Sequence, residues 1–227
     1  MRIFVIAAHP DDEVLGCGAT MAKLAEEGHE VYCTILGEGI TSRYEKREDA
    51  DQELIDMLHS RSRSVSELLG VKQLFLYKLP DNRFDTVPLL DVVKIIEDLI
   101  DSLKPDVIYT HHGGDLNIDH AIVNRATLIA TRPTENHCVK EIYAYEVPSS
   151  TEWAFQQFQN SFKPNVFVDI FSSLDKKIKG MELYESEARN FPHPRSGKAL
   201  SVKAQNWGSA AGLQYAEAFE LIRSIRK

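Results

Sequence analysis

A short apolar run that leads directly into a cluster of ionisable side chains constrains the fold of this 227-residue chain more than any other feature. Residues 3–8 read Ile-Phe-Val-Ile-Ala-Ala, and residues 9–13 read His-Pro-Asp-Asp-Glu. An apolar run of this length is typical of a central strand in a parallel sheet, which is buried on both faces. Ligands of open α/β sheets bind beyond the carboxyl ends of the strands. We therefore expect a buried strand that ends in an active-site loop.

The order of side chains in this loop is suited to binding a cation. His9 and Asp12 are three positions apart and can face one ion if the chain makes a tight turn, which Pro10 favours. Three adjacent carboxylates, at positions 11–13, repel one another unless a cation or a helix N-terminus offsets their charge. Spacing alone leaves a second interpretation open, in which these carboxylates only cap the next helix and fill its first turn.

A second cluster of His and Asp follows another predicted strand, at residues 106–110. Residues 111–120 read His-His-Gly-Gly-Asp-Leu-Asn-Ile-Asp-His, so the two strand ends carry four of the chain's eight histidines. This density of metal-competent side chains is not expected of a loop without a function. We expect neither His111 nor His112 to be a metal ligand, because side chains at a sheet end are commonly satisfied by backbone groups.

Both clusters resemble motifs of a known family. Residues 8–13, Ala-His-Pro-Asp-Asp-Glu, look like the signature of the PIG-L/LmbE-like family of metal-dependent de-N-acetylases, and the Asp-His pair at 119–120 resembles a further motif of that family. Two imidazoles and one carboxylate leave coordination positions open for water and substrate, as a catalytic zinc site requires. The resemblance implies a general base, Asp11, and three zinc ligands, which are His9, Asp12 and His120.

Two residues beside the third ligand have expected supporting roles. Asp119 is a natural partner for the imidazole N–H of a ligand. Some members of the family carry His-x-x-His at this point, and the first His is thought to help stabilise the oxyanion; this chain has Asn117 instead. An amide NH₂ can donate a hydrogen bond to a developing oxyanion without titrating. We therefore expect Asn117 to be catalytic.

Three further polar residues are candidates for binding the substrate, and each also has an ordinary structural explanation. Arg43 lies in a Gly-containing loop, and its guanidinium either binds substrate oxygens or is simply solvated. Asp81 follows the third predicted strand, where it either contacts a sugar hydroxyl or stabilises a turn. His193 lies between two prolines in the polar segment 189–198, close to Arg195. Such a segment either folds over the site or is a surface loop.

Strands alternate with helices along the chain, which predicts an α/β fold with three layers, a Rossmann-like and mostly parallel sheet, and the active site at the carboxyl ends of the strands. A single catalytic domain over residues 1–227 is expected. No Gly-x-Gly-x-x-Gly follows the first strand, so a dinucleotide site is not predicted. Residues 215–219, Tyr-Ala-Glu-Ala-Phe, resemble the family's C-terminus. The predicted strands are 3–8, 30–36, 74–77, 106–110, 141–148 and 165–170, and the predicted helices are 14–28, 45–69, 88–103, 121–131, 172–188 and 213–225.

The net charge and the cysteine content limit the binding partners and the cellular compartment that the sequence predicts. A formal net charge of -8 argues against general affinity for nucleic acid or anionic membranes. No apolar run approaches the roughly 18 residues of a transmembrane helix, and the first residues lack the layout of a signal peptide. Three irregularly spaced cysteines are typical of reduced thiols in a cytoplasmic protein. The sequence leaves a homo-oligomer open.

The reaction that the resemblance implies is hydrolysis. A zinc-activated water, with Asp11 as base, would remove the acetyl group from a small-molecule substrate, an N-acetylated amino sugar or its conjugate. The two-His-one-carboxylate set alone also admits Fe²⁺ and hence a non-haem iron oxygenase. A third hypothesis is a non-catalytic metal- or sugar-binding protein of the same fold. Only hydrolysis has an obvious use for Asp11, because that residue adjoins a ligand without being one.

Overall fold

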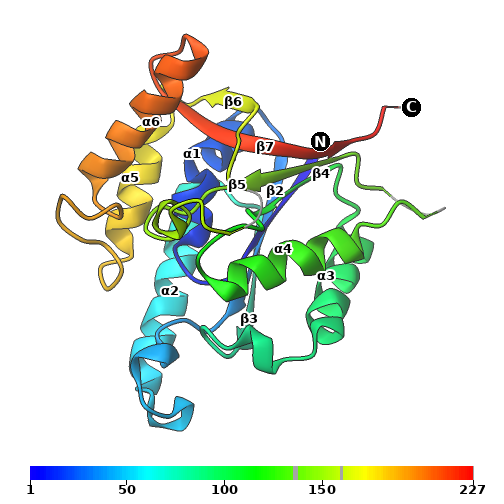
Figure 1. The fold of residues 1–227 in the computed structure, drawn as a ribbon, viewed down its shortest axis with the longest axis vertical. Helices are drawn as coiled ribbons and strands as arrows, with labels where there is room; N and C mark the ends of the chain where they lie inside the picture. Colours follow the sequence, from blue (N-terminus) through cyan, green and yellow to red (C-terminus); the bar gives the residue numbers. More distant parts are fainter. Residues whose placement is uncertain (135–137, 159–160, 227) are drawn as a thin grey trace.

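One seven-stranded sheet forms the centre of the molecule, in the order β3-β2-β1-β4-β5-β7-β6 (Figure 1). The computed structural model describes residues 1–134, 138–158 and 161–226. Strands β1 to β5 run parallel to one another, whereas β7 runs antiparallel to both β5 and β6. The strands are β1 (Arg2–Ala7), β2 (Glu30–Gly37), β3 (Gln73–Leu79), β4 (Val107–His111), β5 (Glu141–Tyr145), β6 (Val166–Asp169) and β7 (Ala216–Ser224).

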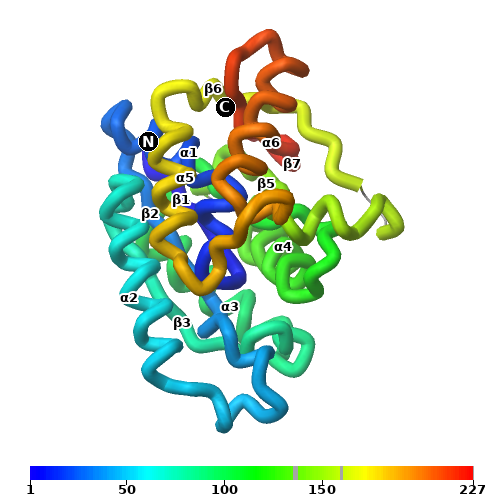
Figure 2. Tube along the Cα trace, turned by 90° about the vertical axis from the view of Figure 1, so that its left-hand side faces the viewer, coloured from blue at the N-terminus to red at the C-terminus, as the bar shows by residue number. Residues whose placement is uncertain are grey.

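Helices cover both faces of this sheet, which confirms the three-layer α/β prediction. Helices α3 and α4 pack on one face, and the other four lie on the opposite face, which Figure 2 turns toward the viewer. The helices in the described ranges are α1 (Asp12–Glu26), α2 (Gln52–Leu68), α3 (Leu89–Leu103), α4 (Ile118–Ala130), α5 (Leu174–Leu183) and α6 (Gly197–Ala211).

The apolar run at the start of the chain forms the buried central strand β1, as predicted. Its side chains alternate between the two faces, as the period of a strand requires. Phe4 and Ile6 pack in the core beneath α3 and α4, while Ile3 and Val5 pack in the core beneath α1 and α2. Because β1 and β4 are parallel neighbours, their carboxyl ends lie at the same edge of the sheet. The two His- and Asp-rich clusters follow these two ends.

The prediction of a closing helix over residues 213–225 is wrong. Residues 216–224 form β7, which lies between β5 and β6. Ala, Glu and Leu favour helices in isolation, but pairing on both sides and burial of Phe219 against Tyr109 and Tyr143 override that preference. Helix α6 was not predicted; its N-cap is Ser196, whose hydroxyl accepts a hydrogen bond from the Ala199 N–H at 3.1 Å.

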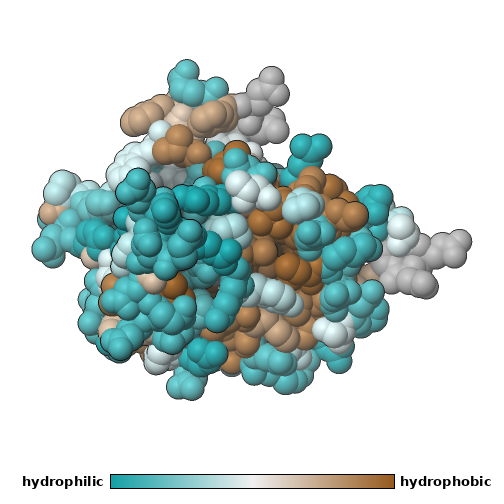
Figure 3. Space-filling model, turned by 90° about the horizontal axis from the view of Figure 1, so that it is seen from below, coloured by the Kyte–Doolittle hydropathy of each residue, from teal (hydrophilic) through white to brown (hydrophobic). Residues whose placement is uncertain are grey.

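No helix in the ranges given above is long and apolar enough to cross a membrane. Seen from below, a broad apolar area lies right of the centre and a smaller one at the top, and hydrophilic side chains cover most of the remaining surface (Figure 3). Cys17, Cys33 and Cys138 are free thiols, and the first two are buried in α1 and β2, as expected of small apolar residues.

Candidate metal centre and active site

The turn between β1 and α1 brings His9 and Asp12 together. The Asp12 carboxylate accepts a hydrogen bond from the His9 backbone N–H at 2.8 Å, and the same Oδ2 lies 3.2 Å from His9 Nδ1. Asp11, the residue between the turn and the helix, has a left-handed backbone with φ of 99°. Such a conformation is uncommon for a residue other than glycine. The tight turn that the His-x-x-Asp spacing requires is therefore present.

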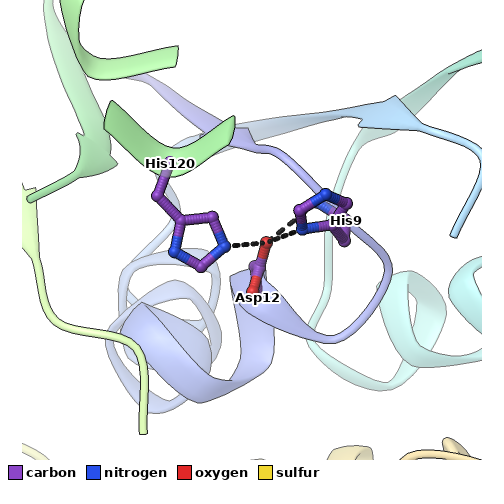
Figure 4. Close-up of side chains that lie close together, drawn as sticks. All are labelled: His9, Asp12 and His120. Atoms are coloured by element: carbon purple, nitrogen blue, oxygen red, sulfur yellow. Dashed lines mark hydrogen bonds and ion pairs between the residues drawn. The ribbon is translucent and has the colours of Figure 1, made fainter. Parts of the chain in front are cut away.

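The first turn of α4 brings His120 to the same point. Its Nε2 atom lies 3.2 Å from Oδ2 of Asp12. Donor atoms of His9, Asp12 and His120 all lie within 4.8 Å of one another, and all three residues are buried. Figure 4 shows both rings directed at the Asp12 carboxylate, with His120 coming from α4 and the other two residues from the β1–α1 turn.

The surroundings of the two imidazoles fit a metal ion. Each ring directs one nitrogen to Asp12 and its other nitrogen to a second carboxylate, an arrangement that is common for imidazoles that bind metal ions. His9 Nε2 is 2.8 Å from Asp119, and His120 Nδ1 is 3.2 Å from Asp115. Nε2 of His120 is buried without a hydrogen-bond partner among the described residues. A cation between these donors would satisfy that atom.

The pKa shifts at the cluster reflect the concentration of carboxylates. Burial lowers the pKa of His120, but the carboxylates of Asp12 and Asp115 outweigh it and raise that pKa to about 9. Burial also opposes protonation of His9, whose pKa is nevertheless raised by its hydrogen bonds with Asp119 and Asp12. Without a cation, the rings thus act as the positive partners of these carboxylates. The charge balance favours a divalent ion at this point.

The three adjacent acidic residues each have a different partner. Asp12 faces the imidazoles, and Asp11 Oδ2 lies 3.0 Å from Arg195 Nη1. Glu13 accepts a hydrogen bond from the Tyr184 hydroxyl at 2.6 Å, and burial raises its pKa to about 7. The side chain of Asp11 makes no capping hydrogen bond to α1. Capping the helix therefore does not explain the acidic run.

The two neighbouring histidines that were not expected to bind metal have other partners. Nε2 of His111 accepts a hydrogen bond from the Ala8 N–H at 2.8 Å, and its ring stacks on His120 with centroids 4.0 Å apart. Burial lowers the pKa of His111, so the ring is neutral. His112 contacts Glu220 through Nδ1 at 2.7 Å. His111 thus supports the ring of His120 by stacking against it.

A cavity of about 580 Å³ opens over the cluster. Its volume is within the range of small-molecule sites. Apolar side chains, among them Leu116, Ile118 and Trp153, contribute to its wall. His193 does not line the cavity; its ring lies edge-on to Trp153, with centroids 5.5 Å apart. The other predicted site residues all line it, namely His9, Asp11, Asp12, Arg43, Asp81, Asn117 and His120.

The predicted substrate-binding residues in this cavity already have protein partners. Both Oε atoms of Glu187 accept hydrogen bonds from Arg43 Nη2, at 2.7 and 2.6 Å. Asp81 Oδ2 accepts bonds from the backbone N–H and the hydroxyl of Ser42, at 3.1 and 2.5 Å, and its Oδ1 lies 3.3 Å from His9 Nε2. Asp81 therefore both stabilises the loop and supports a ligand.

Asn117 has two roles in the local structure. Its Oδ1 accepts a hydrogen bond from the Asp119 N–H at 2.9 Å and so caps α4. Its Nδ2 donates to Oδ1 of Asn82 at 2.9 Å. An amide nitrogen carries two N–H groups, and this contact uses one of them. Asn117 thus lies at the cavity wall with donor capacity beyond its structural contacts.

Sequence reasoning missed three charged residues of the site. Asp115 contacts His120 and accepts a hydrogen bond from Thr151 at 2.6 Å. Arg195 and Glu187 meet at 3.0 Å beside Asp11. No local pattern joins Arg195 and Glu187 to Asp11, because they lie far from it in the sequence. Asp115 lies only five positions before His120 in the second cluster, and its place there is the signal that could have found it.

The site can be compared with known proteins. The sequence model of the family described as GlcNAc-PI de-N-acetylase (PIG-L) matches residues 4–131, which hold both clusters. A relative from Escherichia coli K12, described as the uncharacterized deacetylase YaiS, is 32% identical over 173 residues, which cover 74% of this chain and 81% of the relative. The diacetylchitobiose deacetylase of Thermococcus kodakarensis is 24% identical over 99% of this chain and 84% of its own length.

Among solved structures, the 4-carboxy-2-hydroxymuconate hydratase of Pseudomonas putida KT2440 superposes with a TM-score of 0.77 at 19% identity, over 100% of this chain and 98% of the hydratase. That enzyme is not a deacetylase, so the shared fold by itself does not decide the reaction. The family match rests instead on the sequence segment that contains the cluster. The chain belongs to the GlcNAc-PI de-N-acetylase (PIG-L) family.

Proposed function

We propose that this protein is a metal-dependent hydrolase that removes the N-acetyl group from an N-acetylated amino sugar or its conjugate. The observation that carries the proposal is the buried His9–Asp12–His120 cluster, which lines a cavity of about 580 Å³ with the carboxylate of Asp11 beside it. Family membership and the relative that acts on diacetylchitobiose support it.

The three clustered residues would hold zinc, or Fe²⁺, which the same donors also accept. When bound, the ion would act as a Lewis acid that polarises an amide carbonyl and lowers the pKa of water toward roughly 7. Asp119 and Asp115 orient the two imidazoles so that a lone pair of each faces the ion. The protein thereby fixes the ligand geometry before the substrate arrives.

Asp11 is proposed as the general base. It lines the cavity next to a ligand, and Arg195 faces its Oδ2 atom. The other carboxylate oxygen, Oδ1, can accept the proton of the attacking water and later pass it to the leaving amine. Asn117 is proposed to donate its second amide N–H to the oxyanion that develops at the carbonyl oxygen of the acetyl group. The metal and Asn117 would then share the developing negative charge.

The walls of the cavity are proposed to select the substrate. Arg43 lies at the wall, and its remaining N–H groups can bind a sugar hydroxyl while Glu187 holds its position. Asp81 can accept a hydroxyl hydrogen bond beside His9. His193 lies outside the lining residues, so a contact with it is proposed only for a conjugate that extends past Trp153.

The test is acetate release from N-acetylglucosamine and its inositol, nucleotide, lipid and glycan conjugates, measured without oxygen. Wild-type enzyme should release acetate, and Asp11→Asn should lower kcat by about 100- to 10,000-fold while it keeps its metal. Release without oxygen would exclude an oxygenase. Equal rates for wild type and Asp11→Asn would contradict the role of Asp11. Failure of the wild type on every conjugate, with the metal present, would favour a binding protein.

A further inference from the structure

The side chain of Asp11 is not held by the helix that follows it. The residue has a φ of 99° and serves as the N-cap of α1, yet its side chain makes no hydrogen bond to the helix. Its backbone N–H donates instead to Oε2 of Glu13 at 3.1 Å. Because Asp11 neither caps the helix nor faces the imidazoles, another group must hold its carboxylate in place.

Arg195 is that group. Its Nη1 atom lies 3.0 Å from Oδ2 of Asp11. The contact is an ion pair rather than an aligned hydrogen bond, because Oδ2 has no hydrogen-bond donor of suitable geometry among the described residues. The Asp11 side chain is 3% exposed and that of Arg195 is 26% exposed. Since both groups are largely removed from water, their attraction is screened less than that of a surface pair.

The guanidinium of Arg195 is itself held from two sides. Nε donates to the Ser149 hydroxyl at 2.8 Å, and Nη1 donates to Oε2 of Glu187 at 3.0 Å. Ser149 lies in the segment after β5, and Glu187 lies in the segment after α5. Two separate segments thus orient one planar group, and a guanidinium presents several donors in fixed directions where an ammonium cannot.

We propose that Arg195 is a positioning residue for the general base Asp11. It holds Oδ2 through the ion pair and leaves Oδ1 as the oxygen that takes the proton. This inference rests on the proposed function, because positioning a base matters only if Asp11 is one. Neither the acidic run nor the His-x-x-Asp motif contains Arg195.

Two other roles for Arg195 make different predictions. As a purely structural link, it would fasten the segment before α6 to the body, and its loss would lower stability without a selective effect on kcat. As a substrate ligand, its loss would raise KM. A positioning residue instead affects kcat, and only while Asp11 is present. A double-mutant cycle with Asp11 separates these roles.

The experiment compares Arg195→Met, Arg195→Lys and the control Arg189→Met in the metal-loaded enzyme. Arg189 is in the same segment, but its Nη1 donates hydrogen bonds to the backbone carbonyls of Ser186 and Ala188. Arg195→Met should lower kcat by about 10- to 100-fold. KM and metal content should stay close to those of Arg189→Met. Arg195→Lys should recover part of kcat, because lysine keeps the positive charge but lacks the several fixed N–H donors of a guanidinium.

In the Asp11→Asn background, Arg195→Met should cause no further loss of the residual rate. An equal loss in both backgrounds, an unchanged kcat, or a rise in KM alone would overturn the inference while leaving acetate release by the wild type intact. A crystal structure of metal-loaded Arg195→Met tests the same point without activity. The Asp11 carboxylate should leave its wild-type position, and an unmoved carboxylate would overturn the inference.

Discussion

At the scale of single residues, the site depends on how each carboxylate is paired. Asp12 meets two imidazoles, Asp11 meets Arg195 and Glu13 meets Tyr184, so three adjacent acidic residues do not compete for one partner. The spacing in the sequence predicts that His9 and Asp12 can meet in a local turn, and the family resemblance is what names them as ligands. It does not predict the contact of Arg195 with Asp11, because only the folded chain brings these two positions together.

Replacing Asp119 by Ala should weaken metal binding by about 10- to 100-fold. His9 Nε2 would lose the carboxylate that lies 2.8 Å away, and the ring would no longer be fixed in one tautomer and orientation. Competition for zinc against a chromogenic chelator measures the dissociation constant. Asp85→Ala is the matched control, because that carboxylate is exposed nearby. Equal constants for the two variants would show that Asp119 does not support the site.

At the scale of elements, β7 shows where sequence reasoning fails. Its Ala, Glu and Leu residues favour a helix, but pairing with β5 and β6 decides its structure, and no local pattern reveals those partners. The strand also supplies Glu217, a buried carboxylate that accepts the Thr20 N–H of α1 at 2.7 Å. By contrast, β1 was predicted correctly, because a continuous apolar run before a polar loop indicates a buried strand without knowledge of its neighbours.

Phe219→Ala should lower the free energy of unfolding by about 3–5 kcal/mol. The ring is fully buried between β-sheet neighbours, with its centroid 5.0 Å from that of Tyr109. Ile222→Ala on the same strand is the control, because that side chain is 39% exposed and should cost less. Urea unfolding measures both. Similar losses for the two variants would argue against the observed burial pattern of β7.

At the scale of the whole molecule, the parallel pairing of β1 and β4 is what makes one site from two distant clusters. His9 and Asp12 follow the first strand, and His120 lies in the helix after the fourth. Strand alternation in the sequence predicted this arrangement, since parallel strands end at one edge of the sheet. The polar residues of the cavity wall were less predictable from the sequence. They pair with one another across segments that are distant along the chain, and no local pattern reveals such pairs.

Metal removal should destabilise the folded protein as well as inactivate it. An ion that binds only the folded state at 100 times its dissociation constant adds about 2.7 kcal/mol. In a chain of this length that corresponds to a rise in Tm of roughly 5–10 °C. Thermal unfolding after chelation, and again after zinc is restored, measures the shift. A Tm that does not respond to zinc would mean that the ligands do not bind it in the folded state.

The most direct test of the central claim, that His9, Asp12 and His120 share one metal ion, is elemental analysis of purified wild type beside His120→Ala. The exposed contact of His29 with the N-terminus makes His29→Ala a suitable control. About one zinc or iron per chain is expected in wild type and control, with a clear loss in His120→Ala. No metal in the wild type after reconstitution with zinc, or an undiminished content in His120→Ala, would contradict the account.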